Sequence, residues 1–366
     1  MGYMKKNLVI LTLIISFFSV HTAFGATTTK TSNSTASKSK STTQKKKTTA
    51  PVKLDGVFYF IPGTSAYASI QKYGGKMSVI SPQVYTVDGT GTLKGKLSDQ
   101  MMALITEKKL KVMPLIANEG FNQTIIHTLL GSVDAQKLVI QSLITEAQAK
   151  NYIGWQFDFE HIPASDRDAY SAFVEMAADE FHKNKLVFSV AVLARISENP
   201  EDLPDGSWDN WSGVFDYKRI GAAADFVSLM AYDMPASMGP VATMDWVKQT
   251  TAYVKKFVPA KKLSLGIPTY GWKWDVATNT KLRSVGWGKI DDLQTKKTYK
   301  KKGYDTKAGE AWITYVEDGN HYKIWHENTQ SFKQKYDFAK AQKLKGVSVW
   351  ALGLEDPGIW KHINVI

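Results

Sequence analysis

Cysteine is absent from the 366-residue sequence. Its absence excludes disulfide bonds, zinc sites built on cysteine and a thiol nucleophile. Acidic residues are absent from residues 1–53, which hold nine lysines. Most of the formal net charge of +12 therefore lies in this segment, and the remaining residues carry 37 basic against 34 acidic side chains. The larger part of the chain thus has no electrostatic reason to bind nucleic acid.

The N-terminal segment has the pattern of an export signal. Lys5 and Lys6 precede an apolar stretch from about Leu8 to Val20, and small residues follow around Gly25. This pattern predicts that residues 1–25 are a secretory signal peptide, and hence that the protein is secreted or held in the cell envelope. An uncleaved membrane anchor is the alternative.

Residues 26–53 are mostly Thr, Ser, Lys, Asn and Gln. They cannot bury enough apolar surface to offset the entropy of ordering, so we expect a disordered, cationic linker. Two interpretations stay open for it. A solvated spacer is favoured, and attraction to an anionic cell-wall polymer is the other.

Residues 54–366 alternate short β-rich runs with longer amphipathic segments. Eight strands alternating with helices predict an α/β fold, a (β/α)8 TIM barrel. The expected strands are Val57–Ile61, Met77–Ile80, Lys111–Ile116, Ile153–Glu160, Leu186–Leu193, Phe226–Tyr232, Leu263–Pro268 and Gly346–Ala351. The expected helices include Asp99–Lys109, Asp134–Lys150, Ser165–Lys183 and Thr329–Lys343.

The stretch at about 273–328, after strand seven, is too long for one loop. It contains β-like runs at Trp312–Val316 and Tyr322–Trp325. We therefore expect a small α+β insertion that roofs one side of the barrel mouth.

Strand four carries polar residues where a barrel strand is normally apolar. Side chains alternate along a strand, so its three aromatic residues share one face and Gln156, Asp158 and Glu160 share the other. The aromatic face must pack under the helices, which directs the polar row into the barrel. Interior carboxylates are costly unless they have a function, and barrel active sites lie at the C-terminal ends of the strands. A buried hydrogen-bonded network without catalytic function is the alternative.

Four segments in order resemble family 18 glycoside hydrolases. Gly154-Trp155-Gln156-Phe157-Asp158-Phe159-Glu160 is similar to that family's strand-four motif Asp-Gly-x-Asp-x-Asp-x-Glu, and Met230-Ala231-Tyr232-Asp233 to its Met-x-Tyr-Asp on strand six. Leu265–Gly271 resembles the strand-seven segment, and Gly346–Trp350 the strand-eight end. Two further runs, Pro114–Asn118 and Trp350–Pro357, are similar to the bacterial cell-wall and spore-cortex branch.

The resemblance implies substrate-assisted hydrolysis of a β-linked N-acetylglucosamine polymer, with no metal and no cofactor. It assigns Glu160 as the general acid and base, and Asp158 as the group that orients the substrate's acetamide. Tyr232 would donate its hydroxyl to that acetamide, and Trp350 would be a platform for the sugar. A neighbouring carboxylate raises the pKa of an acid, which suits Glu160 to act near neutrality.

The strand-four motif departs from the family pattern at two positions. Ile153 stands where the first Asp is usual, and Gln156 where the middle Asp is usual. Gln156 is expected to donate a hydrogen bond to Asp158 but cannot take its proton.

Further substrate-binding candidates are Gln156, Asn118, Met230, Asp233 and Tyr270. For Asn118 the alternative is strand termination, for Asp233 a loop cap, and for Tyr270 and its neighbour Trp272 a place in the core. Arg195 is expected either on the surface as an ion-pair partner or as a ligand, and His161 is expected to be structural. The histidines are scattered, so no metal site is expected.

The sequence thus predicts an exported, monomeric glycoside hydrolase acting on peptidoglycan ahead of chitin, with a polysaccharide as its partner. A non-catalytic carbohydrate-binding protein on the same fold is the main alternative, and retention of Glu160 argues against it. An endoglycosidase acting on glycoprotein glycans is a further alternative.

Overall fold

The computed structural model describes residues 55–235 and 238–363. The predicted signal peptide (1–25) and linker (26–53) lie outside the described residues. None of the described helices is long and apolar enough to cross a membrane.

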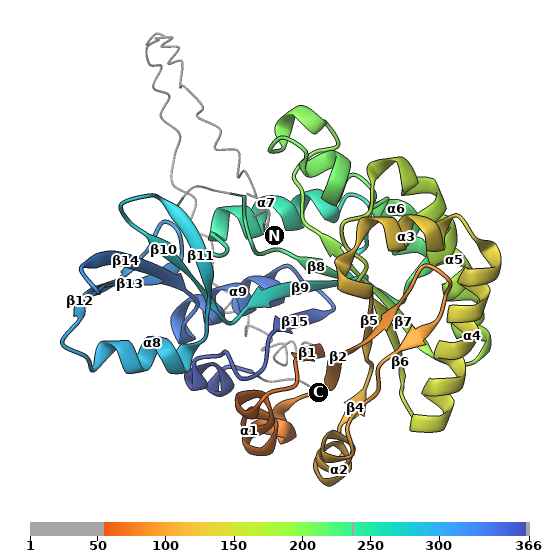
Figure 1. The fold of residues 1–366 in the computed structure, drawn as a ribbon, viewed down its shortest axis with the longest axis horizontal. Helices are drawn as coiled ribbons and strands as arrows, with labels where there is room; N and C mark the ends of the chain where they lie inside the picture. Colours follow the sequence, from red (N-terminus) through yellow and green to blue (C-terminus); the bar gives the residue numbers. More distant parts are fainter. Residues whose placement is uncertain (1–54, 236–237, 364–366) are drawn as a thin grey trace, which may run out of the picture. The chain divides into compact units, whose positions relative to one another are not determined.

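A closed barrel of eight parallel strands forms the body of the described chain (Figure 1). The first strand pairs in parallel with both the second and the last, and this closes the ring. The strands in order are β1 (Asp55–Phe60), β2 (Val79–Val87), β4 with β5 (Lys111–Val112 and Leu115–Asn118), β6 (Gly154–Phe157), β7 (Val187–Leu193), β8 (Phe226–Met230), β9 (Leu263–Pro268) and β15 (Gly346–Trp350). A short strand, β3 (Leu93–Lys94), pairs antiparallel with β2. The predicted TIM barrel is confirmed.

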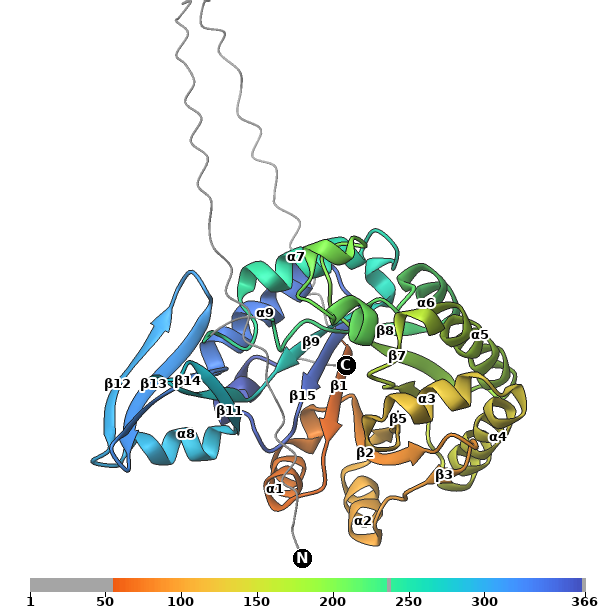
Figure 2. The same ribbon diagram turned by 45° about the horizontal axis from the view of Figure 1, so that its top comes forward.

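Helices cover the outside of the strands, as Figure 2 shows for α3 to α6. Their apolar faces and the outward strand residues form one large buried cluster. The helices outside the insertion are α1 (Thr64–Tyr73), α2 (Asp99–Lys108), α3 (Gln123–Leu130), α4 (Val133–Lys150), α5 (Arg167–Lys183), α6 (Tyr217–Ala223), α7 (Met244–Val254) and α9 (Thr329–Ala341).

The largest differences from the predicted strand boundaries are in the second, third and fourth strands. The second strand extends to Val87, seven residues past its predicted end at Ile80. The third is split around Pro114, which has no backbone N–H to give to a strand ladder. The fourth ends at Phe157, so Asp158 and Glu160 follow the strand instead of belonging to it.

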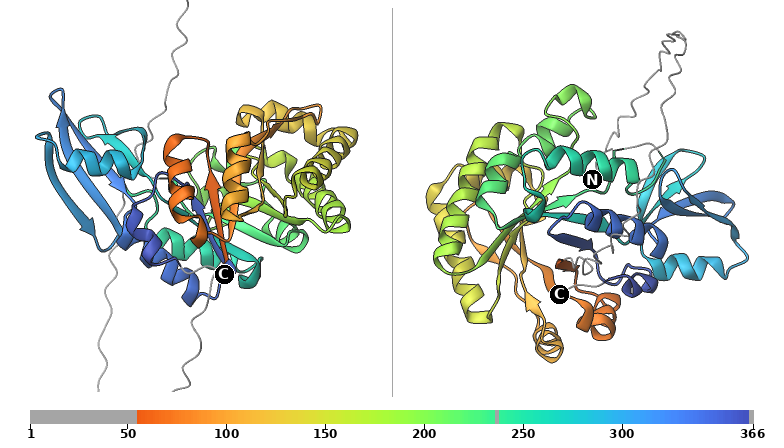
Figure 3. Two further views of the ribbon diagram at one scale, coloured as in Figure 1. Left: turned by 90° about the horizontal axis from the view of Figure 1, so that it is seen from below. Right: turned by 180° about the vertical axis from the view of Figure 1, so that it is seen from behind.

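A second sheet of five antiparallel strands lies between β9 and α9 in the sequence, and to one side of the barrel in Figures 1 and 3. It consists of β10 (Gly271–Asp275), β11 (Thr280–Val285), β12 (Tyr299–Asp305), β13 (Glu310–Glu317) and β14 (Asn320–His326), with α8 (Trp287–Gln294). Residues of β13 and β14 pack with α8 around a small core of their own. We call this segment, residues 271–327, the insertion; it includes Glu327, which directly follows β14.

Two buried contacts join the insertion to the barrel. The carboxylate of Glu310, in β13, accepts hydrogen bonds from the backbone N–H groups of Val241 and Ala242, which precede α7. Glu327, just after β14, accepts a hydrogen bond from Lys335 of α9 at 2.5 Å. Both partners of the second contact are almost wholly shielded from solvent.

Candidate active site

Strand β6 directs its residues as the alternation predicts. Trp155 and Phe157 are buried among the residues under the helices, and Phe159 joins them beyond the strand end. The ring of Phe157 lies 4.8 to 5.2 Å, centroid to centroid, from three further phenylalanines. This packing fixes the strand, so that Gln156 lies in the barrel interior with no exposed surface.

The side chain of Gln156 is held by three neutral groups. Its amide nitrogen donates to Ser189 Oγ at 2.8 Å and to Ser228 Oγ at 3.0 Å, and its oxygen accepts from the hydroxyl of Tyr59 at 2.7 Å. Both amide hydrogens are therefore used, and none is left for Asp158. The prediction that Gln156 donates a hydrogen bond to Asp158 is wrong, because Ser189 of β7 and Ser228 of β8 accept both hydrogens of the amide.

Contacts between serine hydroxyls continue from Ser228 across the interior of the barrel. Ser228 Oγ lies 2.8 Å from Ser348 Oγ, which lies 2.7 Å from Ser264 Oγ. These buried hydroxyls satisfy one another, and none carries a charge. Asp158 therefore lies above an uncharged layer.

Burial sets the acidity of the two carboxyl groups that follow β6. It raises the pKa of Asp158 to about 7. Burial is also the largest cause that raises the pKa of Glu160, to about 8, and the charges of Asp158 and Asp233 add to it. The sequence predicted the direction for Glu160 from like-charge proximity alone, whereas desolvation contributes more.

Asn118, the last residue of β5, holds the backbone of Glu160. Its side-chain oxygen accepts from the Glu160 N–H at 3.1 Å, and its amide nitrogen donates to the Glu160 carbonyl at 3.1 Å. The same nitrogen donates to the carbonyl of Asn122. Asn118 is buried, and this pair of hydrogen bonds fixes the position of the residue that carries the proposed acid.

Two aromatic residues orient Asp233: Tyr270, between β9 and β10, and Trp272, in β10. The hydroxyl of Tyr270 donates to Asp233 Oδ1 at 2.6 Å, and the indole N–H of Trp272 donates to the same oxygen at 2.7 Å. Tyr270 is buried, while Trp272 keeps part of its ring exposed. One oxygen of the carboxylate is thus held by two aromatic side chains that follow β9, and the next helix, α7, is capped by Thr243.

Tyr232 follows β8 and Trp350 is the last residue of β15, and β9 lies between these two strands in the barrel. A Cβ atom on Gly266 would come within 2.8 Å of the ring of Tyr232, so only glycine leaves room for this tyrosine. Burial raises the pKa of the Tyr232 hydroxyl well above its ordinary value, which keeps it a donor. The ring of Trp350 lies 5.2 Å from that of Tyr59, and Met230, the last residue of β8, is half-buried.

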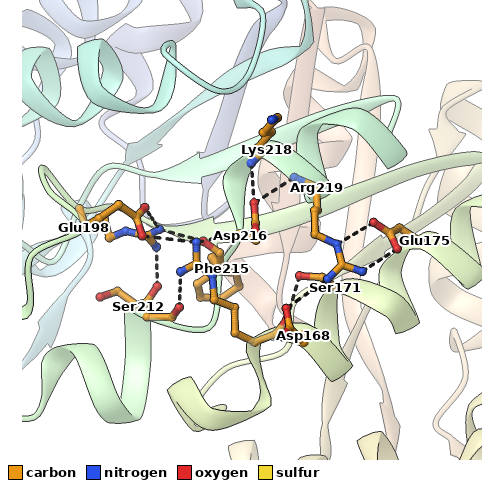
Figure 4. A network of polar contacts seen from close by, with 12 residues as sticks. Asp168, Ser171, Glu175, Glu198, Ser212, Phe215, Asp216, Lys218 and Arg219 are labelled. Atoms are coloured by element: carbon orange, nitrogen blue, oxygen red, sulfur yellow. Dashed lines mark hydrogen bonds and ion pairs between the residues drawn. The ribbon is translucent and has the colours of Figure 1, made fainter.

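The prediction for Arg195 needs correction. Arg195 has no exposed surface, and it donates to the backbone carbonyls of Ser212 and Phe215 (Figure 4), so it is neither a surface residue nor a free ligand. His161 has a positive φ of 57°, and its ring lies 3.7 Å from that of Trp211.

Tyr59 was missed at the sequence level. It occupies an inward position of β1 and contacts Gln156. A tyrosine on the interior face of a predicted barrel strand was the signal that could have identified it. Within residues 55–235 and 238–363, no three His, Asp or Glu side chains are placed to hold a metal ion.

A comparison with models of protein families shows to which family this chain belongs. The family model for Glycosyl hydrolases family 18 matches residues 10–355. This chain belongs to that family. The family 18 motifs proposed from the sequence therefore lie on a barrel of the matching fold, and the chain is a glycoside hydrolase of family 18 type.

Two proteins from Bacillus subtilis (strain 168) are similar in sequence to this chain. The chain is 30% identical over 317 residues to an uncharacterized glycosylase, YvbX, covering 84% of this chain and 90% of the relative. It is 26% identical over 280 residues to a cortical fragment-lytic enzyme, covering 74% of this chain and 63% of that enzyme.

Solved structures share the fold. The spore cortex-lytic enzyme SleL of Bacillus megaterium QM B1551 superposes with a TM-score of 0.77 at 22% identity, over 87% of this chain and 76% of that one. A chitinase from Chromobacterium violaceum ATCC 12472 superposes with a TM-score of 0.75 at 25% identity, over 85% of this chain and 98% of that one.

Proposed function

We propose that this family 18 enzyme is exported and cleaves a β-linked glycan containing N-acetylglucosamine, with peptidoglycan ahead of chitin. The observation that carries the proposal is the pair Asp158 and Glu160 at the barrel mouth, both with raised pKa. An acid must hold its proton at working pH to protonate a leaving group, and burial keeps Glu160 protonated at neutral pH.

In the proposed mechanism the substrate's acetamido oxygen attacks the anomeric carbon. Glu160 gives its proton to the glycosidic oxygen, the bond to the leaving sugar breaks, and a cyclic oxazolinium forms. The carboxylate of Asp158 orients the acetamide N–H and stabilises the positive charge, while the hydroxyl of Tyr232 donates to the acetamide oxygen. Water then attacks the anomeric carbon and loses a proton to Glu160 while the bond from that carbon to the acetamido oxygen breaks, which regenerates the acetamide and retains the configuration.

Around this centre, Trp350 is proposed as the sugar platform, and Asp233 with Tyr270 as groups that bind sugar hydroxyls. Asp233 has one carboxylate oxygen held by Tyr270 and Trp272, so its other oxygen is oriented for a ligand. Gln156, Asn118 and Met230 support these groups from the strand ends. Peptidoglycan is placed first because the relatives include cortical fragment-lytic enzymes.

Replacing Glu160 by Gln tests the assignment of the acid. The amide keeps the shape but has no proton to give, so hydrolysis should fall by about 10²–10⁴-fold. The matched control is Glu119→Gln, which changes a carboxylate beyond the end of β5 that pairs with Lys94 at the surface. Equal melting temperatures would show that both variants fold, and an active Glu160→Gln enzyme would refute the assignment.

The substrate is identified by incubating the wild type with chitin oligomers and with purified peptidoglycan, and by mass analysis of the products. A thiazoline analogue of N-acetylglucosamine should inhibit, because it mimics the oxazolinium. A covalent sugar adduct on Asp158 would instead mean that this carboxylate is the nucleophile. N-terminal analysis of protein from the culture medium tests export, with Ala26 as the expected first residue.

A further inference from the structure

The insertion holds all the net charge of residues 54–366. Residues 271–327 contain 11 basic and 8 acidic side chains, whereas the other residues of 54–366 contain 26 of each. A local excess of cations attracts anionic ligands and gives no advantage to neutral ones. The insertion also borders the proposed active site, because the indole N–H of Trp272, in β10, donates to Asp233.

Three lysines of the insertion lie in one row across its sheet. The strands of this sheet follow the order β11-β10-β14-β13-β12 (Figure 1). In that order the register aligns Lys281, Trp274, Lys323, Thr314 and Lys301. Residues that pair across antiparallel strands project from the same face of a sheet, so a lysine occurs on every second strand of this face. We call Lys281, Lys323 and Lys301 the lysine row.

The lysine row lies on the face of the sheet opposite to α8. Ile313 and Ile324 pack with α8 in the small core of the insertion. Ile324 directly follows Lys323, and successive side chains of a strand project from opposite faces. Lys281 and Lys301 are exposed, and Lys323 is half-buried, so all three ammonium groups lie on a surface that α8 does not cover.

Indole rings on the same face hold the ammonium groups of the lysine row. The distances from Nζ to the ring centroid are 4.4 Å for Lys281 over Trp272, 4.0 Å for Lys323 over Trp325 and 5.9 Å for Lys301 over Trp312. A cation is attracted to the face of an indole, and this attraction restricts an otherwise flexible side chain. Less entropy is then lost when the N–H groups of the ammonium bind a ligand.

Within the described residues, the lysine row has no carboxylate as an ion-pair partner. Lys273, by contrast, lies on the opposite face and pairs with Glu317. Burial lowers the pKa of Lys323, and the more distant charge of Asp305 acts in the opposite direction. An anion bound at Lys323 would therefore restore stabilisation that the ammonium lost with its water.

Protection of the sheet edges explains only part of the lysine row. Lysines on edge strands discourage pairing with another chain, and β11 and β12 are the two edges of this sheet. Lys323 lies on β14, the middle strand, where no edge needs protection. Its partly buried charge thus requires a different explanation.

We propose that the lysine row binds a glycan with a carboxylate-bearing substituent on every second sugar, and thereby favours peptidoglycan over chitin. The proposal rests on the proposed function. In peptidoglycan every second sugar carries a lactyl group that ends in a carboxyl group or in a peptide, whereas chitin is uncharged. Neighbouring strands are about 4.8 Å apart, so lysines on every second strand are about 9.6 Å apart, close to the length of two β-linked sugars. Charge and spacing both match such a glycan.

The test compares two substrates that have the same backbone and different charge. One consists of peptidoglycan strands freed of their peptides by an amidase, so that every second sugar carries a carboxylate. In the other, these carboxylates are converted to methylamides. The wild type should have the higher kcat/KM on the charged strands, and added salt should reduce the difference because it screens the attraction.

Lys323→Met should lower kcat/KM on the charged strands by about 3- to 10-fold, mainly through KM, because one charge-assisted contact with the substrate is lost. The loss on the methylamide strands should be much smaller. Lys323→Arg keeps the charge and should keep most of the preference for charged strands. The matched control is Lys289→Met, which removes an exposed lysine from α8, on the other side of the sheet.

The possible failures are distinguishable. If the wild type cleaves neither kind of strand nor chitin oligomers, the proposed function is wrong. If it cleaves both kinds of strand equally well, or chitin oligomers alone, it is a glycosidase and the role of the lysine row is refuted. Equal losses of Lys323→Met on charged and methylamide strands would also refute that role. So would an equal loss in Lys289→Met, because the effect would then depend on net charge and not on the row.

Discussion

Replacing Gln156 by Asp tests how protons are shared beside the proposed acid. The new carboxyl would lie in a position with no exposed surface, two residues before Asp158. At a rise of about 3.3 Å per residue the Cα atoms of positions 156 and 158 are about 6.6 Å apart, and two carboxyl groups that project in parallel have about the same separation. Two like charges at that distance repel by about 2.5 kcal/mol at an effective dielectric constant of about 20, which corresponds to about 2 pKa units.

This repulsion adds to burial, so the new carboxyl at position 156 should keep its proton while Asp158 ionises. The variant therefore carries one additional proton, on the carboxyl at position 156, and no additional negative charge. A protonated carboxyl can turn towards Asp158 and donate a hydrogen bond to its ionised form, which the amide of Gln156 does not do. A hydrogen bond to a charged group contributes about 1.5 kcal/mol, enough to lower the pKa of Asp158 by about one unit.

The assay is the pH profile of kcat/KM on a soluble chitin oligomer. Burial raises the pKa of Asp158, and Asp158 must be ionised to act, so it sets the acidic limb of the wild-type profile. In Gln156→Asp that limb should move to lower pH by about one unit. Gln156→Asn is the matched control, since it shortens the side chain equally and adds no titratable proton.

Two results would contradict this reasoning. A shift of the acidic limb to higher pH would mean that the new carboxyl ionises first and adds a charge. Profiles that superimpose for the Asp and Asn variants would mean that position 156 does not communicate with Asp158 at all. Activity should be tracked together with melting temperature, because both variants lose part of the contacts with Ser189 and Ser228.

Two further predictions concern positioning and stability. Asn118→Ala should lower kcat by about 10- to 100-fold with little change in KM, because the backbone of Glu160 loses both hydrogen bonds that fix it; steady-state kinetics and an unchanged KM would check this. Lys335→Met should lower the free energy of unfolding by about 3–5 kcal/mol, since it leaves Glu327 buried and unpaired. Urea unfolding should show a change of at most about 1 kcal/mol for Lys333→Met, which removes a half-exposed ion pair from the same helix. Equal losses in the two lysine variants would contradict the argument from burial.

The sequence predicted the barrel and the inward row of β6 because both depend on short-range patterns. Aromatic residues at alternate positions can pack under helices on one face only, so the direction of Gln156 followed without any knowledge of its neighbours. The partners of Gln156 could not be predicted in the same way. Ser189 and Ser228 lie 33 and 72 residues further along the chain, and their level in the barrel depends on the register of two strand pairs.

Arg195 shows a second limit of the sequence pattern. An arginine is almost never fully buried unless it is paired, so an exposed or ligand-binding position was the reasonable expectation. Two of its partners are backbone carbonyls, at Ser212 and Phe215. Every residue has such a carbonyl, and the sequence therefore carries no sign of which ones will converge. His161 lies beyond the end of β6 and has a positive φ, so the alternation of the strand gives no direction for its side chain.

The contacts between insertion and barrel limit how freely the two can be exchanged between proteins. Glu310 satisfies two backbone N–H groups of the barrel, and Glu327 neutralises a buried lysine. A chimaera in which a short loop replaced the insertion would leave these barrel groups buried without partners. Grafting the insertion onto another barrel would bury its carboxylates without donors. In protein engineering, the insertion and the segments 241–242 and 327–335 should therefore be transferred together or left in place together.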